Sequence, residues 1–130
     1  MDAQSTPIRA KMHEGKTVLL DCWATWCSPC MKKMPGLKKL YEDWRNKGLV
    51  VIGINFDHTW EAAEAVIRKS ELPWPQVYVP ADQTVRDFWY RSSSIKTLPA
   101  FLIIDRRGTL REFTNDPAAL ETKLLELLAE

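Results

Sequence analysis

The sequence carries little excess charge of either sign and no long apolar stretch. Its 18 Lys and Arg residues are interspersed with 17 Asp and Glu residues, which gives a formal net charge of +1. This distribution lacks the concentrated basic patch that nucleic-acid-binding proteins usually need. The longest apolar runs have the length of a strand, well short of the roughly 20 residues that a membrane-spanning helix requires. We therefore expect neither nucleic acid as a partner nor a direct membrane span in this chain.

An apolar segment of the kind found in secretory signal peptides is also missing from residues 1–15. That absence is consistent with a cytoplasmic protein, and equally with an extracytoplasmic one whose targeting segment is absent from this chain. The 130 residues, 45% hydrophobic and 27% charged, suit one globular domain with a core of its own. We expect an N-terminal extension over residues 1–14, a single domain over 15–130, and a monomer.

Cysteine is scarce and its number is odd. Three residues, Cys22, Cys27 and Cys30, cannot all pair within one chain, which excludes a fully paired disulfide framework. A structural zinc site is disfavoured, because zinc takes four ligands and His13 and His58 lack the paired spacing that would complete a set. Cys22, inside an apolar run, is interpreted as a small buried hydrophobe, with a resolving or regulatory thiol as the alternative. Only Cys27 and Cys30 have the spacing of a functional pair.

Apolar periodicity predicts alternating strands and helices. Strands are expected over 16–24 and 49–56, with a short one near 76–79 and a hairpin that turns near Arg107 and Gly108. Helices are expected over 29–46, 60–72 with Thr59 as N-cap, 84–91, and from Asp116 and Pro117 onward. This order indicates an α/β fold with a mixed central sheet flanked by helices. The last two strands of the sheet must be antiparallel, because so tight a turn cannot join parallel strands.

Cys27 falls where the first strand gives way to a helix, with Pro29 in the first helical turn. Unpaired N–H groups and the positive end of the helix dipole favour an anion there, and cysteine pKa values in such places fall to about 3.5–7.5. We therefore expect Cys27 to be an exposed thiolate nucleophile, and the more shielded Cys30 to resolve the mixed disulfide that Cys27 forms. A purely structural disulfide is the alternative, although so short a loop restricts the unfolded chain little.

The stretch WATWCSPC, residues 23–30, resembles the active-site segment of the thioredoxin superfamily. With TLPAFLIIDRRG and the closing helix, residues 15–129 are similar to the TlpA-like branch, which consists of extracytoplasmic thiol–disulfide oxidoreductases. The resemblance implies a thioredoxin-like fold in which residues 60–79 are an inserted helix–strand segment. It also implies a redox-active Cys27–Cys30 disulfide, with no other cofactor and no metal.

The same resemblance assigns roles to residues around the pair. Pro99 matches the family's cis-proline beside the redox cysteines, which would leave the backbone of Leu98 free to pair with an extended substrate segment. The alternative for Pro99 is a simple strand opener. Trp26 would form part of an apolar docking rim, while Ser28 and Pro29 would influence the redox potential.

Asp21 is an acid within an apolar strand. Burying a carboxylate is costly unless it is neutral or paired, and burial raises its pKa. Asp21 matches the buried acid of thioredoxins, so we expect it to exchange a proton with Cys30, directly or through water. The alternative is a solvent-facing aspartate at a strand end. Two departures from the family are Gly53, where thioredoxins carry a lysine, and Lys33, where some TlpA-like reductases carry a glutamate. We interpret Lys33 as a solvated helix residue; the alternative is that it points towards the site, where its charge would favour the thiolate.

Together these residues predict a thiol–disulfide oxidoreductase that reduces or isomerises protein disulfides and is re-reduced by a donor protein. The resemblance places it in the periplasm or cell envelope, with the cytoplasm as the alternative. A different class of function is a chaperone that holds Cu(I) between the two thiols, since this soft ion accepts two thiolates. A peroxiredoxin-like peroxidase is disfavoured, because no arginine partner lies near Cys27 in the sequence.

Overall fold

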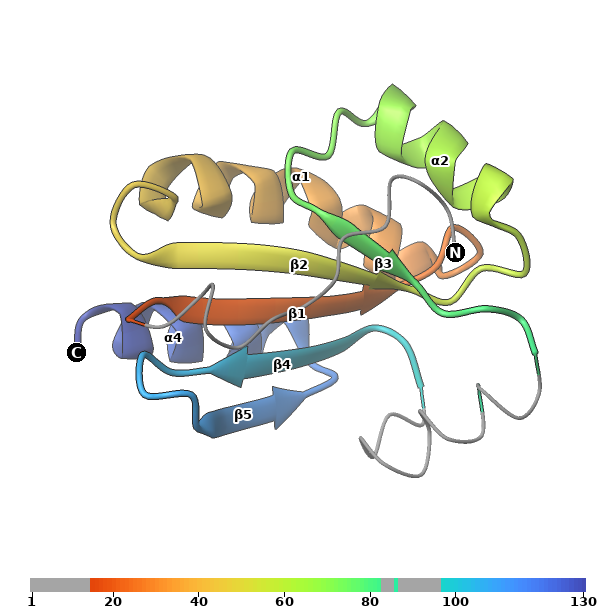
Figure 1. Ribbon diagram of the computed structural model, residues 1–130. Coiled ribbons are helices and arrows are strands. Elements are labelled where there is room, and N and C mark those ends of the chain that lie inside the picture. The colour runs from red at the N-terminus through yellow and green to blue at the C-terminus, as the bar shows by residue number, and fades with distance from the viewer. Residues whose placement is uncertain (1–14, 83–85, 87–96) are drawn as a thin grey trace.

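A computed structural model describes residues 15–82, 86 and 97–130. Its centre is a five-stranded sheet in the order β3-β2-β1-β4-β5 (Figure 1). The strands are β1 (Thr17–Trp23), β2 (Leu49–Asn55), β3 (Gln76–Tyr78), β4 (Ala100–Ile104) and β5 (Leu110–Thr114). Strands β1, β2 and β3 are parallel, β4 is antiparallel to β1, and β5 is antiparallel to β4. The mixed sheet and its antiparallel C-terminal hairpin are as predicted.

Strand β1 lies in the middle of the sheet because its sequence can be buried on both faces. Leu19 and Trp23 belong to one hydrophobic cluster, and Val18 and Cys22 belong to another. Successive side chains of a strand point to opposite faces, so Asp21 shares the face of Leu19 and Trp23. The strand thus carries an acid into the interior, two residues before its own end at Trp23.

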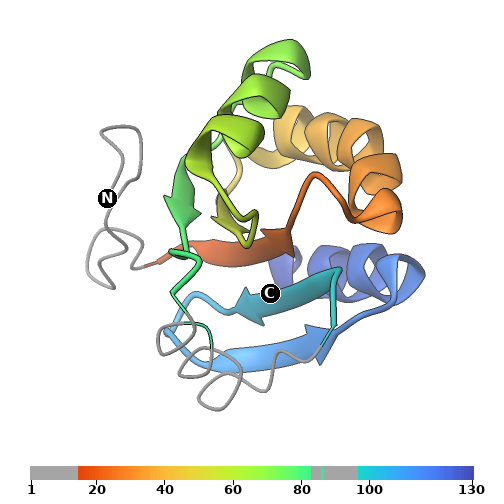
Figure 2. The ribbon, with the colours of Figure 1, turned by 90° about the vertical axis from the view of Figure 1, so that its right-hand side faces the viewer.

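The helices α1 (Ser28–Trp44), α2 (Trp60–Lys69) and α4 (Pro117–Leu128) all contribute side chains to the cluster that contains Leu19 and Trp23. Figure 2 shows them on one side of the sheet. The N-caps of α2 and α4 are the predicted ones: Thr59 Oγ1 accepts the N–H of Ala62 at 3.3 Å, and Asp116 Oδ1 accepts the N–H of Ala118 at 3.0 Å.

Helix α2 is shorter than its predicted span of 60–72, because it ends at Lys69 and Glu71 adopts a left-handed conformation with φ of 52°. Leu72 then turns into the core. The helix expected over 84–91 lies outside the described residues except for Arg86, and the extension expected over 1–14 lies outside them entirely. The division into an extension and a domain therefore stays a prediction.

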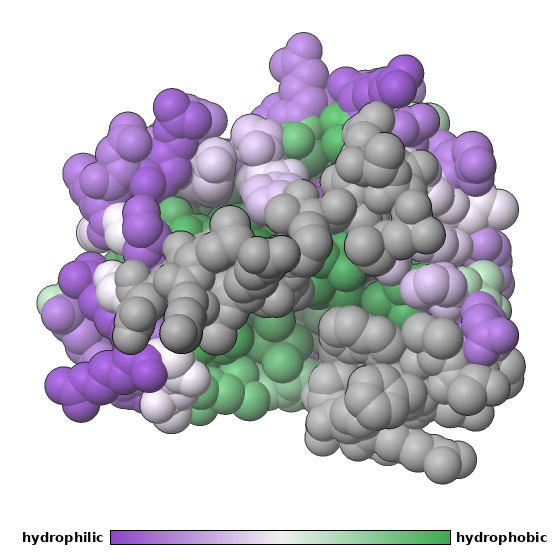
Figure 3. All heavy atoms as spheres, viewed as in Figure 1, coloured by the Kyte–Doolittle hydropathy of each residue, from purple (hydrophilic) through white to green (hydrophobic). Residues whose placement is uncertain are grey.

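The face of the sheet opposite these helices carries the second cluster, which includes Val18, Cys22, Ile52, Ile54 and Leu102. Figure 3 views the molecule from this side, and hydrophobic side chains gather over the middle of the sheet with hydrophilic ones along its edges. Cys22 is 1% exposed here, and burial raises the pKa of its thiol far above its ordinary value. Its interpretation as a small buried hydrophobe agrees with this position.

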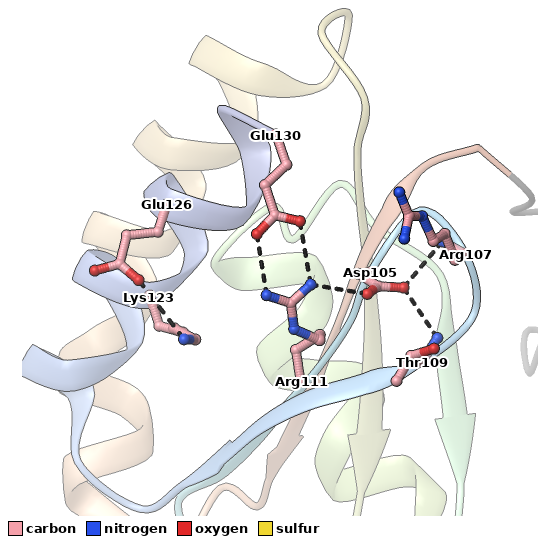
Figure 4. Close-up of polar contacts among 7 residues, drawn as sticks. All are labelled: Asp105, Arg107, Thr109, Arg111, Lys123, Glu126 and Glu130. Atoms are coloured by element: carbon pink, nitrogen blue, oxygen red, sulfur yellow. Dashed lines mark hydrogen bonds and ion pairs between the residues drawn. The ribbon is translucent and has the colours of Figure 1, made fainter.

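The β4–β5 hairpin is held by a polar network at the end of the sheet away from the cysteines (Figure 4). Asp105 Oδ1 accepts the backbone N–H groups of Arg107 and Thr109 at 2.9 and 3.0 Å, and Gly108 turns the chain with φ of 85°. Arg111 bridges Asp105 and Glu130, with a 3.0 Å ion pair to each. The N–H of Thr109 and the Arg111 guanidinium lower the pKa of Asp105. The network ties the hairpin to the end of the chain.

No helix within residues 15–82, 86 and 97–130 combines the length and the apolar character needed to cross a bilayer.

Candidate active site

The two motif cysteines lie at the junction between β1 and α1. Cys27 is the N-cap residue of α1, and Cys30 lies in the helix's first turn, with a disulfide joining the two. Cys27 Sγ accepts a hydrogen bond from the backbone N–H of Cys30 at 3.3 Å. One of the helix's otherwise unpaired N–H groups is thus directed at the sulfur, which confirms the predicted placement of Cys27 at a helix start.

The predicted exposure of Cys27 is wrong. Cys27 is 4% exposed and Cys30 is 2% exposed, so the disulfide leaves the first sulfur hardly more accessible than the second. The reason is the N-cap geometry, which turns the Cys27 side chain back over the first turn and into the cluster that includes Trp23 and Met34. The large exposed group at this end is instead Trp26, which is 59% exposed and stands where a docking rim is expected.

Ser28 and Pro29 occupy the first turn of α1, and both are exposed. A proline fits there because a residue in the first turn has no helical partner for its N–H. They lie between Cys27 and Cys30, whose N–H bonds the Cys27 sulfur. The two residues thus sit beside the pair as expected, and their effect on the redox potential stays a prediction.

The loop that leads into Cys27 is anchored by a buried acid. Asp57, just beyond the end of β2, accepts both the backbone N–H and the hydroxyl of Thr25, the latter at 2.7 Å. Asn55 Nδ2 donates to the same carboxylate at 2.9 Å, and Asp57 is 2% exposed. None of the motifs above singles out Asp57. The available signal is its place at the carboxyl end of a parallel strand, where polar residues gather at functional edges.

Arg86 fastens the same region from the other side. Its guanidinium donates to the backbone carbonyls of Phe56 and Asp57, each at 2.6 Å, and to those of Val79 and Pro80 at 3.0 and 3.1 Å. It therefore ties together the segments that follow β2 and β3. With Thr25 held by Asp57, the loop before the disulfide rests on the ends of two neighbouring strands.

Asp21 lies on the α1 face of the sheet, the face to which Cys30 and Met34 also belong. It is 2% exposed, which excludes the solvent-facing alternative. Burial raises the pKa of Asp21 to about 7, while the nearby charge of Lys33 acts in the lowering direction. A carboxyl group with that pKa can both accept and donate a proton near neutral pH.

Lys33 is not the fully solvated helix residue that the sequence suggests. Its side chain is half-buried between α1 and the start of α4, where Nζ donates to the carbonyl of Pro117 at 3.4 Å. Its charge acts on Asp21 from α1. The position that carries a lysine in thioredoxins is Gly53, the register partner of Asp21 on β2. The acid therefore has a cation nearby, supplied by a different element.

The bond between Leu98 and Pro99 is cis, as expected. Pro99 is buried, and Asn115 Nδ2 donates to its carbonyl at 2.8 Å. The half-buried Leu98 packs against the cluster that holds Cys27 and Cys30. The turn before β4 thus reaches the hydrophobic cluster to which both cysteines belong.

Within the described part of the chain, no three His, Cys, Asp or Glu residues are grouped so that they could hold a metal ion.

A cysteine pair at the start of the helix after a central strand, with a cis X-Pro bond just before the neighbouring strand of a mixed sheet, defines the class: a redox protein of thioredoxin fold. Comparison with known proteins gives the family. The chain belongs to the Thioredoxin-like family, whose sequence model matches residues 15–110.

Individual relatives agree with this assignment. The thiol-disulfide oxidoreductase ResA of Bacillus cereus is 30% identical over 111 residues, which are 85% of this chain and 61% of that protein. ResA of Oceanobacillus iheyensis is 31% identical over 110 residues, 83% of this chain and 54% of that protein. The thioredoxin domain of a thiol-disulfide oxidoreductase from Bacteroides vulgatus superposes with a TM-score of 0.76 at 27% identity, covering 90% of this chain and 83% of that one.

These matches confirm the predicted fold class and superfamily. The names of the relatives favour the oxidoreductase interpretation over the Cu(I)-chaperone alternative. The chain spans 61% and 54% of the length of these two ResA relatives.

Proposed function

We propose that this protein is a thiol–disulfide oxidoreductase that exchanges its Cys27–Cys30 disulfide with disulfides and dithiols of other proteins. The observation that carries the proposal is the hydrogen bond from the Cys30 N–H to Cys27 Sγ at the start of α1. In the reduced protein the same N–H, with the positive end of the helix dipole, stabilises a thiolate on Cys27. Cys27 is then the nucleophile and Cys30 the resolving thiol.

The exchange proceeds in two displacements. The Cys27 thiolate attacks one sulfur of a substrate disulfide, which forms a mixed disulfide and releases the other substrate sulfur as a thiolate that takes up a proton. Asp21 then accepts the proton of the Cys30 thiol, and the resulting thiolate attacks Cys27 Sγ. The second substrate thiolate leaves, the Cys27–Cys30 bond closes, and two electrons have passed to the substrate. A donor protein restores the dithiol by the reverse sequence.

Substrate contact is assigned to the exposed and extended groups around the pair. Trp26 offers an apolar surface beside the disulfide, and exposed aromatics of this kind are favoured in protein interfaces. Leu98 packs against the cluster that holds the disulfide and precedes a cis proline, so its backbone is assigned to pair with an extended segment of the substrate. Docking of that segment must also give it access to Cys27, which the disulfide form keeps buried.

The compartment and the direction of electron flow belong to this proposal as well. An extracytoplasmic location, in the periplasm or cell envelope, suits a reductase or isomerase that a separate donor protein keeps reduced. In the cytoplasm the same pair would act as an ordinary thioredoxin-type reductant. We expect a monomer that needs no cofactor beyond its own disulfide.

The proposal is tested by insulin reduction with dithiothreitol, followed by equilibration in glutathione buffers. The expected result is catalysed precipitation of the insulin B chain and a Cys27–Cys30 potential below about −250 mV, towards the thioredoxin end of the known range. A potential near −120 mV would make the protein an oxidant and overturn the assigned direction. Absence of any catalysis, with Cys27 and Cys30 fully reducible, would overturn the function itself.

A further inference from the structure

Asp21, Gly53 and Gln76 form one row across three neighbouring strands. Asp21 of β1 pairs with Gly53 of β2, and Gly53 pairs with Gln76 of β3. Paired positions in a parallel sheet direct their side chains to the same face, so Asp21 and Gln76 share the face that α1 covers. Only Gly53 lies between them.

The missing side chain of Gly53 is what lets the two polar groups approach each other. A Cβ atom at residue 53 would overlap Oε1 and Cδ of Gln76, so the amide of Gln76 already occupies the space above the glycine. Adjacent strands are about 4.8 Å apart. The amide therefore lies over β2, and Asp21 is on the next strand.

Trp23 sets the orientation of this amide. The indole Nε1 of Trp23 donates to Gln76 Oε1 at 2.9 Å. An indole N–H can only donate, so the amide oxygen must face Trp23 and Nε2 must face away from it. Gln76 Nε2 and Asp21 Oδ2 are both buried, and neither has a hydrogen-bond partner within the described residues. A free donor and a free acceptor are thus left on one sheet face.

We propose that Gln76 is the positioning residue of Asp21, and that its side-chain amide is the hydrogen-bond partner of the Asp21 carboxyl group through one bridging water during proton exchange with Cys30. The inference rests on the proposed function. With Oε1 held by Trp23, the free N–H groups of the amide are donors, and a donor to the carboxylate favours the ionised form of the acid. A lysine would favour that form more strongly, because it adds a full positive charge.

Cys22, the next residue on β1, is also titratable, and burial and the charge of Asp21 raise the pKa of its thiol, although its side chain points to the opposite face. The other groups of this kind that act on Asp21 within the described residues come from α1. They are Lys33, whose charge favours the carboxylate, and Cys30, with which the proton is exchanged. On β2 the row offers only Gly53, and on the opposite side Asp21 pairs with the apolar Phe101 of β4. Gln76 is therefore the uncharged polar group placed to adjust the acid without fixing its charge.

The test is a titration of the Asp21 carboxyl carbon by NMR in the oxidised protein, for the wild type, Gln76→Met and Gly53→Ala. Methionine keeps the length of glutamine and removes its amide, whereas alanine at 53 keeps the amide and displaces it. We expect both variants to raise the pKa of Asp21 by about one unit, because the carboxylate loses a donor. In the reduced proteins, the pH profile of insulin reduction should move upward by the same amount.

The control is Gln76→Met in an Asp21→Asn background, where the pH profile should stay in place. If both variants leave the Asp21 titration within about 0.3 units of the wild type, smaller than a lost hydrogen bond would produce, the proposal is wrong. If Gln76→Met lowers the rate of insulin reduction equally with Asp21 and with Asn at residue 21, Gln76 acts only through packing and the proposal is wrong. If Gln76→Met does not fold, the Asp21 titration in Gly53→Ala tests the proposal alone. The titration needs no turnover, so it tests Gln76 even if the proposed function fails.

Discussion

Replacing Cys27 with serine lowers the catalysed reduction of insulin more than about a thousandfold, because a serine hydroxyl stays protonated where the cysteine forms a thiolate. The helix N-terminus that stabilises the sulfur anion at Cys27 cannot ionise an alcohol at neutral pH. Turnover by the purified variant, measured against the uncatalysed reaction of dithiothreitol with insulin, checks this expectation.

The partner variant, Cys30→Ser, separates the two roles. It should still attack the substrate but should then accumulate a mixed disulfide on Cys27, because nothing resolves it. Mass spectrometry should show one substrate chain per protein molecule. Cys22→Ala is the matched control, since Cys22 lies on the opposite face of the sheet and takes no part in the exchange. Equal activity of Cys27→Ser and wild type, or a mixed disulfide on Cys30 in the Cys27→Ser variant, would contradict the assigned roles.

The second large effect concerns the stability of the oxidised protein. Asp21 has a pKa of about 7 when folded against an ordinary value of 3.8. Between these two values the folded state holds a proton that the unfolded state has lost, so stability falls as pH rises from about 4 to about 7 and then levels off. The shift corresponds to roughly 4 kcal/mol in the free energy of unfolding. Asp21→Asn removes this loss.

Denaturant unfolding of wild type and Asp21→Asn at pH values from 4 to 9 measures the difference. The advantage of the variant over the wild type should grow by about 4 kcal/mol up to neutral pH and stay constant above it. The exposed Asp43, replaced by Asn, serves as control and should show almost no such trend. A difference between wild type and Asp21→Asn that does not change with pH would contradict the raised pKa.

The features that could be predicted from sequence are those that a local pattern determines. Apolar runs and caps such as Thr59 and Asp116 locate the strands and helix starts because their causes lie within a few residues. The cysteine spacing and the strand-to-helix junction place Cys27 correctly for the same reason. Asp21 stands out because an acid in an apolar strand is unusual.

The features that could not be predicted depend on contacts between distant segments. Thr25 and Asp57 are 32 positions apart, Trp23 and Gln76 are 53 apart, and Lys33 meets Pro117 across 84. Only the three-dimensional register brings such pairs together. The burial of Cys27 belongs to this group, because it depends on the turn of one side chain into the core rather than on the helix start that the sequence reveals.

The most direct test is the pH dependence of iodoacetamide alkylation of Cys27 in the reduced Cys30→Ser variant, followed by mass spectrometry. The midpoint of this profile reports the pKa of the thiol, whereas shielding of the sulfur lowers the rate at every pH. A midpoint between about 4 and 7.5 is the predicted result, since the start of α1 favours the anion. A midpoint at or above about 8.5, the value of a free cysteine, would show that the helix start does not activate this sulfur.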